Sequence, residues 1–338
     1  MNIAVEATSA AQMAPLPEQE LASASTGQDL HMTLADAEHE SQDDFDEDQD
    51  GPGAVHWGLQ GADLSESEEE AVNLFMAHVN SWRRARKFAP LSRESTVKFL
   101  MARKFAVDRA LALYQQHELM RVREKLTGIL PPPDQDEDNS PTGLKAEMKS
   151  GKFTVLQTRD SYGAALALFN AHMHDPHKSV HKTTLQNVVY QLDVALEDPL
   201  TQRCGLVFIY NMAGSKYANF DYDLSQKILT LLKGCYPARL KKVLIVTAPL
   251  WFKAPFKVLR LFVREKLRDR VFTVSMPQLV THVPPEALPP ILGGQTAHDH
   301  EAWLEHCALV TAKVREREKL QQSSSGESCV YKDLLNIK

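Results

Sequence analysis

Two apolar runs in the second half of the chain are separated by an amphipathic stretch. Residues 205–212 (GLVFIYNM) and 241–249 (KKVLIVTAP) are almost continuously apolar, which is typical of strands buried on both faces of a sheet. Between them, residues 223–235 place leucine and isoleucine side chains at helical spacing. A strand, a helix and a second strand in this order predict a βαβ unit in a mainly parallel sheet.

The flanking segments extend this α/β pattern. We predict strands at residues 152–158, 163–172 and 271–275, a helix at 180–196, and a last, charged helix at 301–320 followed by a flexible tail, QQSSSGES. The fold class is therefore α/β, with a mixed, mainly parallel sheet and flanking helices.

The first half of the ordered chain has helical periodicity only. Ser65 and Glu68 have the spacing of a capping box, and apolar residues follow at helical spacing until Pro90. A second helix is predicted from about Ser92, and a third from about Asp108 to Leu126. These three helices predict a small helical subdomain.

Composition divides the chain into five segments. Residues 1–62 are acidic and almost free of aromatic residues, so they cannot bury enough apolar surface to fold and are predicted to be disordered. The predicted organisation is a tail (1–62), a helical subdomain (63–130), a Pro-rich and acidic linker (131–144), the α/β domain (145–297) and a C-terminal helix with its tail (298–338).

Charge is unevenly distributed along the 338 residues, whose net charge is −6. Residues 1–82 contain no Lys or Arg, whereas residues 239–270 contain ten basic and two acidic residues. A local charge of +8 predicts an anionic partner for this window. The acidic tail is an alternative interaction site, either for a basic protein partner or as a shield for the basic window.

Motifs for catalysis and for metal binding are missing. There is no Gly-rich phosphate loop, no nucleophile elbow, and no Arg six positions after any of the four cysteines, as a tyrosine phosphatase loop requires. A histidine cluster is better explained as a polar strand end and loop than as a metal site; its members are His172, His174, His177 and His181. We therefore expect no enzymatic activity, no metal and no cofactor.

Residues 251–263 (WFKAPFKVLRLFV) combine strong hydrophobicity with basic charge. As a helix, this segment is apolar on most sides and carries a basic stripe of Lys253, Lys257, Arg260 and then Arg264. It is either a core helix with a solvated basic edge or a helix that meets an anionic membrane surface.

Several motifs in their order resemble the Sec14-like (CRAL-TRIO) lipid-binding family. They are FLMARKF at 99–105, VFIY at 207–210, Tyr236-Pro237-x-Arg239, IVTAPxxF at 245–252 and LPxxLGG at 288–294. The resemblance covers residues 68–296. Three further stretches resemble the lipid-binding module of a family member that also carries a phosphatase domain.

This resemblance implies a hydrophobic pocket on the sheet, closed by a mobile helix that opens at membranes. Residues 251–264 correspond to that helix and are called the gate segment below. The resemblance departs from the phosphatidylinositol-transfer members at Ala238, where they have an acidic residue, and at Leu267, where they have Thr. A looser, charge-based recognition of phosphoinositides or phosphatidylserine is therefore expected.

The predicted site residues fall into two sets. Those expected to bind lipid headgroups are Arg239, Lys242, Lys253, Lys257, Arg260, Arg264, Arg268 and Arg270. Those expected to form the pocket and gate are Tyr210, Tyr236, Trp251, Phe252, Phe256, Leu259 and Phe262.

These predictions define a function. We expect a non-catalytic phospholipid-binding protein that is cytoplasmic and reversibly peripheral on vesicles or other endomembranes, with no nucleic-acid partner. The alternatives are a carrier of a hydrophobic small molecule, such as a retinoid or tocopherol, and an interaction protein that uses its acidic tail.

Overall fold

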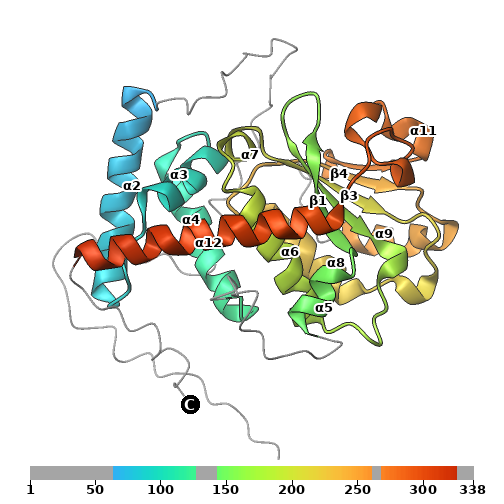
Figure 1. Cartoon of the computed structure of the whole chain (residues 1–338), viewed down its shortest axis with the longest axis horizontal. Helices are drawn as coiled ribbons and strands as arrows, with labels where there is room; N and C mark the ends of the chain where they lie inside the picture. Colours follow the sequence, from blue (N-terminus) through green and yellow to red (C-terminus); the bar gives the residue numbers. More distant parts are fainter. Residues whose placement is uncertain (1–63, 127–142, 261–267, 326–338) are drawn as a thin grey trace, which may run out of the picture. The chain divides into compact units, whose positions relative to one another are not determined.

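The computed structural model describes residues 64–126, 143–260 and 268–325, which are drawn in colour in Figure 1. The predicted tail at 1–62 lies outside the described residues, as do most of the predicted linker and residues 261–267 of the gate region. The domain boundaries predicted in these segments therefore stay predictions.

Three helices lie in the segment that was predicted as a helical subdomain: α2 (Glu66–Ala85), α3 (Arg93–Ala102) and α4 (Val107–Arg123). The capping box is confirmed, because Glu68 N–H donates to Ser65 Oγ and Ser65 N–H donates to the Glu68 carboxylate. Ser92 caps α3 as predicted. The three helices bury an aromatic cluster in which the rings of Phe99 and Tyr114 meet edge to face at 5.2 Å.

The α/β domain contains one five-stranded sheet in the order β1-β2-β3-β4-β5. Its strands are β1 (Phe153–Arg159), β2 (Ala165–Asn170), β3 (Leu206–Asn211), β4 (Leu240–Val246) and β5 (Val271–Val274). Only β1 and β2 pair antiparallel, and the other neighbours are parallel, so the predicted mixed, mainly parallel sheet is confirmed. Position 205 requires glycine, because a Cβ atom there would lie 2.3 Å from the Arg239 carbonyl oxygen.

Apolar side chains cover both faces of this sheet, which explains the continuous apolar runs in the sequence. On one face, Val243 and Ile245 of β4 belong to the larger core, together with residues of the flanking helices. On the other face, Leu244 and Val246 pack with the segment that follows β5. Successive residues of a strand point to opposite faces, so from Lys242 to Val246, after the register shift that follows Leu240, even and odd positions lie on opposite faces.

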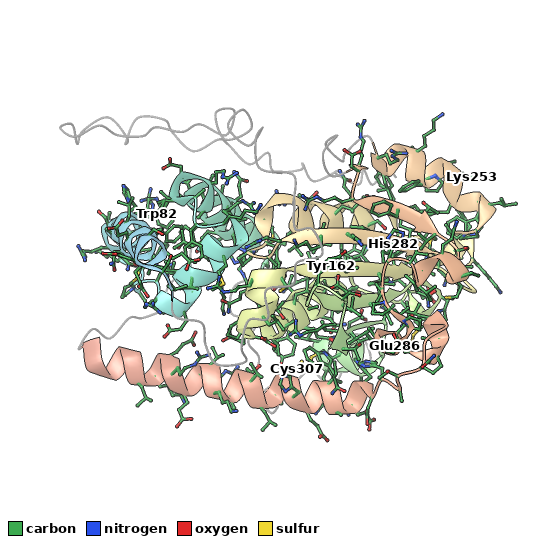
Figure 2. The ribbon with its side chains drawn as sticks, turned by 90° about the horizontal axis from the view of Figure 1, so that it is seen from above. Trp82, Tyr162, Lys253, His282, Glu286 and Cys307 are labelled. Atoms are coloured by element: carbon green, nitrogen blue, oxygen red, sulfur yellow. The ribbon has the colours of Figure 1, made fainter. Side chains whose placement is uncertain are left out.

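Helices precede the sheet, connect its strands and follow it. They are α5 (Leu144–Lys149), α6 (His181–Ala195), α7 (Pro199–Cys204), α8 (Tyr222–Thr230), α9 (Lys253–Leu259), α11 (Met276–Leu279) and α12 (His300–Ser325). The long helix α12 packs on β1 and α6, with Cys307 on its buried side (Figure 2). Its Trp303 indole N–H donates to Gln191 of α6 at 2.8 Å.

Three predictions at element level need correction. A regular helix was predicted at 223–235, but the α-helix ends at Thr230, and the next residues form a π-helical turn, Leu231–Cys235. The C-terminal tail was predicted to start after residue 320, but α12 continues to Ser325. The gate segment begins with a 3-10 turn, Leu250–Phe252, before α9, rather than as one continuous helix.

Candidate functional site

A small apolar pocket lies between α9 and the sheet. Its walls come from α8, β4, α9 and β5, and its lining residues are Leu229, Val243, Ile245, Phe256, Leu259, Arg260, Arg268 and Val271. The cavity volume is about 40 Å³, whereas pockets that hold small organic ligands measure roughly 300–1,000 Å³. The space that these residues enclose takes a few water molecules at most.

An aromatic cluster holds the start of the gate segment against the body of the protein. Phe252 is buried, and its ring stacks on Phe256 at 5.6 Å and meets Phe220 edge to face at 5.6 Å. Trp251 contacts Phe220 at 6.1 Å and the exposed Tyr217 at 5.6 Å. The position of α9 therefore depends on the loop that contains Tyr217 and Phe220.

The outer side of α9 is basic. Lys253, Lys257 and Arg260 are all exposed, and Figure 2 labels Lys253 on this helix. Two apolar side chains are exposed beside them. Val258 of α9 is 44% exposed, and Leu250 of the preceding 3-10 turn is 81% exposed. Basic and apolar groups on one short helix give the composition that suits the interface of an anionic membrane.

Arg260 also connects this basic side to the pocket. Its guanidinium lies 5.7 Å from the centre of the Phe256 ring, within cation–π range. Arg268 Nε donates to the Arg260 carbonyl oxygen at 3.1 Å. The structure therefore brings together four of the predicted headgroup residues: Lys253, Lys257, Arg260 and Arg268.

The remaining predicted headgroup residues lie elsewhere. Arg239 Nε donates to the Met101 carbonyl oxygen of α3 at 3.0 Å, and Arg270 donates to the Leu240 carbonyl oxygen at 2.8 Å. Lys242 alternates with Val243 on β4 and so lies on the face opposite α9. There, burial and the nearby Lys242 ammonium lower the pKa of His282. Arg264 lies outside the described residues.

Some of the predicted pocket residues lie at this pocket, and others lie elsewhere. Phe256 and Leu259 line the pocket, and Trp251 and Phe252 hold its helix, whereas Phe262 lies outside the described residues. Tyr210 stacks on Phe169 at 5.5 Å, and burial raises the pKa of its phenol well above the ordinary value. Tyr236 is buried in a different place, at the junction with the helical subdomain.

Tyr236 belongs to a closed ring of polar contacts that the sequence did not reveal. Its hydroxyl donates to Asp193 Oδ1 at 3.0 Å, and Arg121 donates to Asp193 Oδ2. Arg121 Nε also donates to His117 Nε2 at 2.9 Å, so the imidazole proton is on Nδ1 and is donated to the Cys235 carbonyl oxygen at 2.8 Å. Burial, with Arg121 beside it, lowers the pKa of His117 to about 4.

This ring joins three elements that are far apart in the sequence. His117 and Arg121 come from α4, Asp193 from α6, and Cys235 and Tyr236 from the end of the π-helical turn. A π-helical turn disrupts the regular helical hydrogen bonds, and His117 satisfies one of the carbonyl groups at its end. The helical subdomain is therefore bonded directly to the segment that leads into β4.

Two members of the histidine cluster share one carboxylate. His174 and His181 both contact Asp221 Oδ2, while His172 and His177 are exposed. Among residues 64–126, 143–260 and 268–325, no three His, Cys, Asp or Glu side chains are placed to hold a metal ion. In the same part of the chain, every helix is too short or too polar to span a bilayer.

Comparisons with known proteins agree with this fold. Residues 148–294 match the model of the CRAL/TRIO domain. The fold resembles the crystal structure of Sfh5, with a TM-score of 0.50 at 10% identity over 77% of this chain and 99% of that chain.

The sequence is also similar to those of several curated proteins. The tyrosine-protein phosphatase non-receptor type 9 of Homo sapiens is 44% identical over 241 residues, which are 71% of this chain but 39% of the relative. The alpha-tocopherol transfer protein-like protein of Homo sapiens is 27% identical over 61% of this chain and 60% of the relative. Clavesin-1 of Rattus norvegicus is 28% identical over 59% of this chain and 56% of the relative. Together with the sheet topology, these matches show that residues 148–294 match a CRAL/TRIO domain in sequence and in fold.

Proposed function

We propose that this chain binds one phospholipid, a phosphoinositide or phosphatidylserine, at the cytosolic surface of vesicle membranes. The observation that carries the proposal is the structure of α9. Its inner residues, Phe256 and Leu259, close an apolar pocket, and its outer side exposes Lys253, Lys257 and Arg260. One helix thus offers apolar contacts for acyl chains and positive charges for headgroup phosphates.

Binding requires α9 to move. The pocket of about 40 Å³ that the described residues line is too small for an acyl chain, so in this proposal the form described here is the closed one. Movement of α9 away from β4 would expose Val243 and Ile245, which are apolar side chains on the floor of the pocket. The exposed Leu250 and Val258 would stabilise the open form by entering the membrane interface.

A carrier of a hydrophobic small molecule is the second candidate. The apolar lining of the pocket suits such a ligand, and one relative is named an alpha-tocopherol transfer protein-like protein. In that case, the basic side of α9 would serve only to dock the carrier on membranes. A protein partner for the acidic residues 1–62 stays a separate prediction from the sequence.

Vesicle co-sedimentation tests the proposal. We expect strong binding to liposomes that contain phosphatidylserine or a phosphoinositide and weak binding to neutral phosphatidylcholine liposomes. Raising the ionic strength from 0.1 M to 1 M should weaken binding, because the Debye length falls from about 10 Å to about 3 Å. Equal binding to neutral and anionic liposomes, or binding to neither, would contradict it.

A further inference from the structure

A buried carboxylate shared by two histidines joins the loop after β2 to the start of α8. Asp221 is the N-cap of α8, and its Oδ1 accepts the Leu224 N–H at 2.9 Å. Its Oδ2 accepts a hydrogen bond from His174 Nε2 at 3.3 Å and another from Nε2 of His181, which is the first residue of α6. We call residues 171–181 and 217–224, which meet at this carboxylate, the histidine clasp.

The position of His174 suits only a neutral imidazole. This side chain is 2% exposed, and with Nε2 directed at Asp221, its Nδ1 is buried without a hydrogen-bond partner among the described residues. The Phe169 ring lies 6.2 Å away. Protonation would place a second N–H at Nδ1, and a buried donor without an acceptor destabilises the arrangement.

The charged groups around His174 are few and come from several elements. Lys152, before β1, is 3% exposed and is held by Glu147 of α5 and by Ser179. Asp221 comes from the start of α8, and His181 comes from α6. Burial and the Lys152 ammonium lower the pKa of His174, and the Asp221 carboxylate only partly opposes them.

The histidine clasp contacts Trp251 and Phe252, which directly precede α9. Asn219 Nδ2 donates to the His174 carbonyl oxygen at 2.8 Å. The next residue, Phe220, is the ring that contacts both Trp251 and Phe252 at the base of α9. Any displacement of residues 217–221 therefore changes the packing that holds α9 over the pocket.

From these contacts we infer that the histidine clasp is an acid-sensitive device: protonation of His174 opens it and loosens α9. The inference rests on the proposed function, since it gives a trigger for the movement of α9. The surface potential of an anionic membrane, about −30 mV, raises the proton concentration at the membrane surface about threefold. Docking on such a surface would therefore favour the open form of the same site.

The direction of the pH effect follows from the lowered pKa of His174 in the closed form. The closed clasp binds fewer protons than the open one, so it is most stable above the ordinary histidine pKa of about 6.5. Its stability falls as the pH drops below that value. Asp221, whose pKa is lowered despite its burial, stays ionised throughout this range and adds nothing.

Hydrogen exchange of the full chain without lipid tests this inference. Opening constants, corrected for the intrinsic exchange rate, are measured at pH 7.5 and 5.5 for peptides that cover the clasp and residues 250–259. We expect both regions to open more at pH 5.5, together and by up to about tenfold. His174→Gln keeps a donor toward Asp221 but cannot be protonated, so it should abolish the response. His78→Gln, at an exposed histidine of α2, should leave it intact.

Other outcomes would overturn the inference. An unchanged clasp at pH 5.5 would show that the clasp does not sense pH. A full response in His174→Gln would assign the response to another histidine, such as the buried His117 or the half-buried His298. If the clasp opens while residues 250–259 stay protected from exchange, opening of the clasp is not coupled to α9. If His174→Gln fails to fold, an NMR titration of His174 in the native chain replaces it, and a charged imidazole at pH 7 contradicts the inference. None of these results bears on lipid binding itself, which co-sedimentation tests separately.

Discussion

Replacing Lys253, Lys257 and Arg260 together with alanine should weaken binding to anionic liposomes about a hundredfold. Each basic residue near an anionic surface contributes about 1 kcal/mol, and about 1.4 kcal/mol corresponds to a factor of ten. The three side chains are exposed on α9, and alanine preserves helix formation. The measurement is co-sedimentation with vesicles of fixed phosphatidylserine content at constant ionic strength.

Two controls separate the position of the charges from their number. Lys182, Lys313 and Lys319 are equally exposed but lie on α6 and α12, so the triple alanine variant at these positions should bind almost normally. Lys242→Ala should also have little effect, because Lys242 lies on the face of the sheet opposite α9. A loss as large in the Lys182, Lys313 and Lys319 variant would mean that total charge, rather than the basic side of α9, determines binding.

Replacing Asp193 with alanine should lower the free energy of unfolding by about 1.5–3 kcal/mol. Arg121 and Asp193 form a half-buried ion pair, with 19% and 20% of the two side chains exposed, and removing Asp193 leaves a hydrogen-bonded charge without its partner. Arg121 would lose its carboxylate, and the buried Tyr236 hydroxyl would lose its acceptor. Urea denaturation followed by circular dichroism measures the effect.

Asp193→Asn is the matched variant. The amide oxygen can still accept one hydrogen bond, so the loss should be clearly smaller than with alanine. Asp223→Ala serves as the control, because Asp223 is an exposed carboxylate on α8. If Asp193→Ala unfolds at the same urea concentration as the Asp223→Ala variant, the polar ring does not hold the helical subdomain to the sheet.

Local signals in the sequence were sufficient to predict most of the fold. The Ser65 capping box, the apolar runs of β3 and β4 and the periodicity of α6 each depend on neighbouring residues, and each is confirmed. The π-helical turn at Leu231–Cys235 was missed because helical periodicity does not distinguish it from a regular last turn. Its stabilising partner, His117, lies 118 residues away.

The candidate site was only partly predictable for the same reason. The basic and apolar residues of α9 are neighbours in sequence, so their common helix could be predicted. The sequence could also have shown that Lys242 lies away from these residues, because Lys242 alternates with the buried Val243 on β4 and so points to the other face of the sheet. By contrast, the contacts of Arg239 with Met101 and of Tyr236 with Asp193 join distant segments, and no sequence pattern indicates them.

Native mass spectrometry of the full chain, after incubation with mixed liposomes and re-isolation, tests the central claim most directly. If α9 opens over an apolar pocket and holds one phospholipid, the spectrum should show a one-to-one complex with the mass of a phosphoinositide or phosphatidylserine. The Lys253, Lys257 and Arg260 triple variant should acquire much less of it. A chain that returns without lipid, or that instead takes up a retinoid or tocopherol offered in the same mixture, would contradict the account.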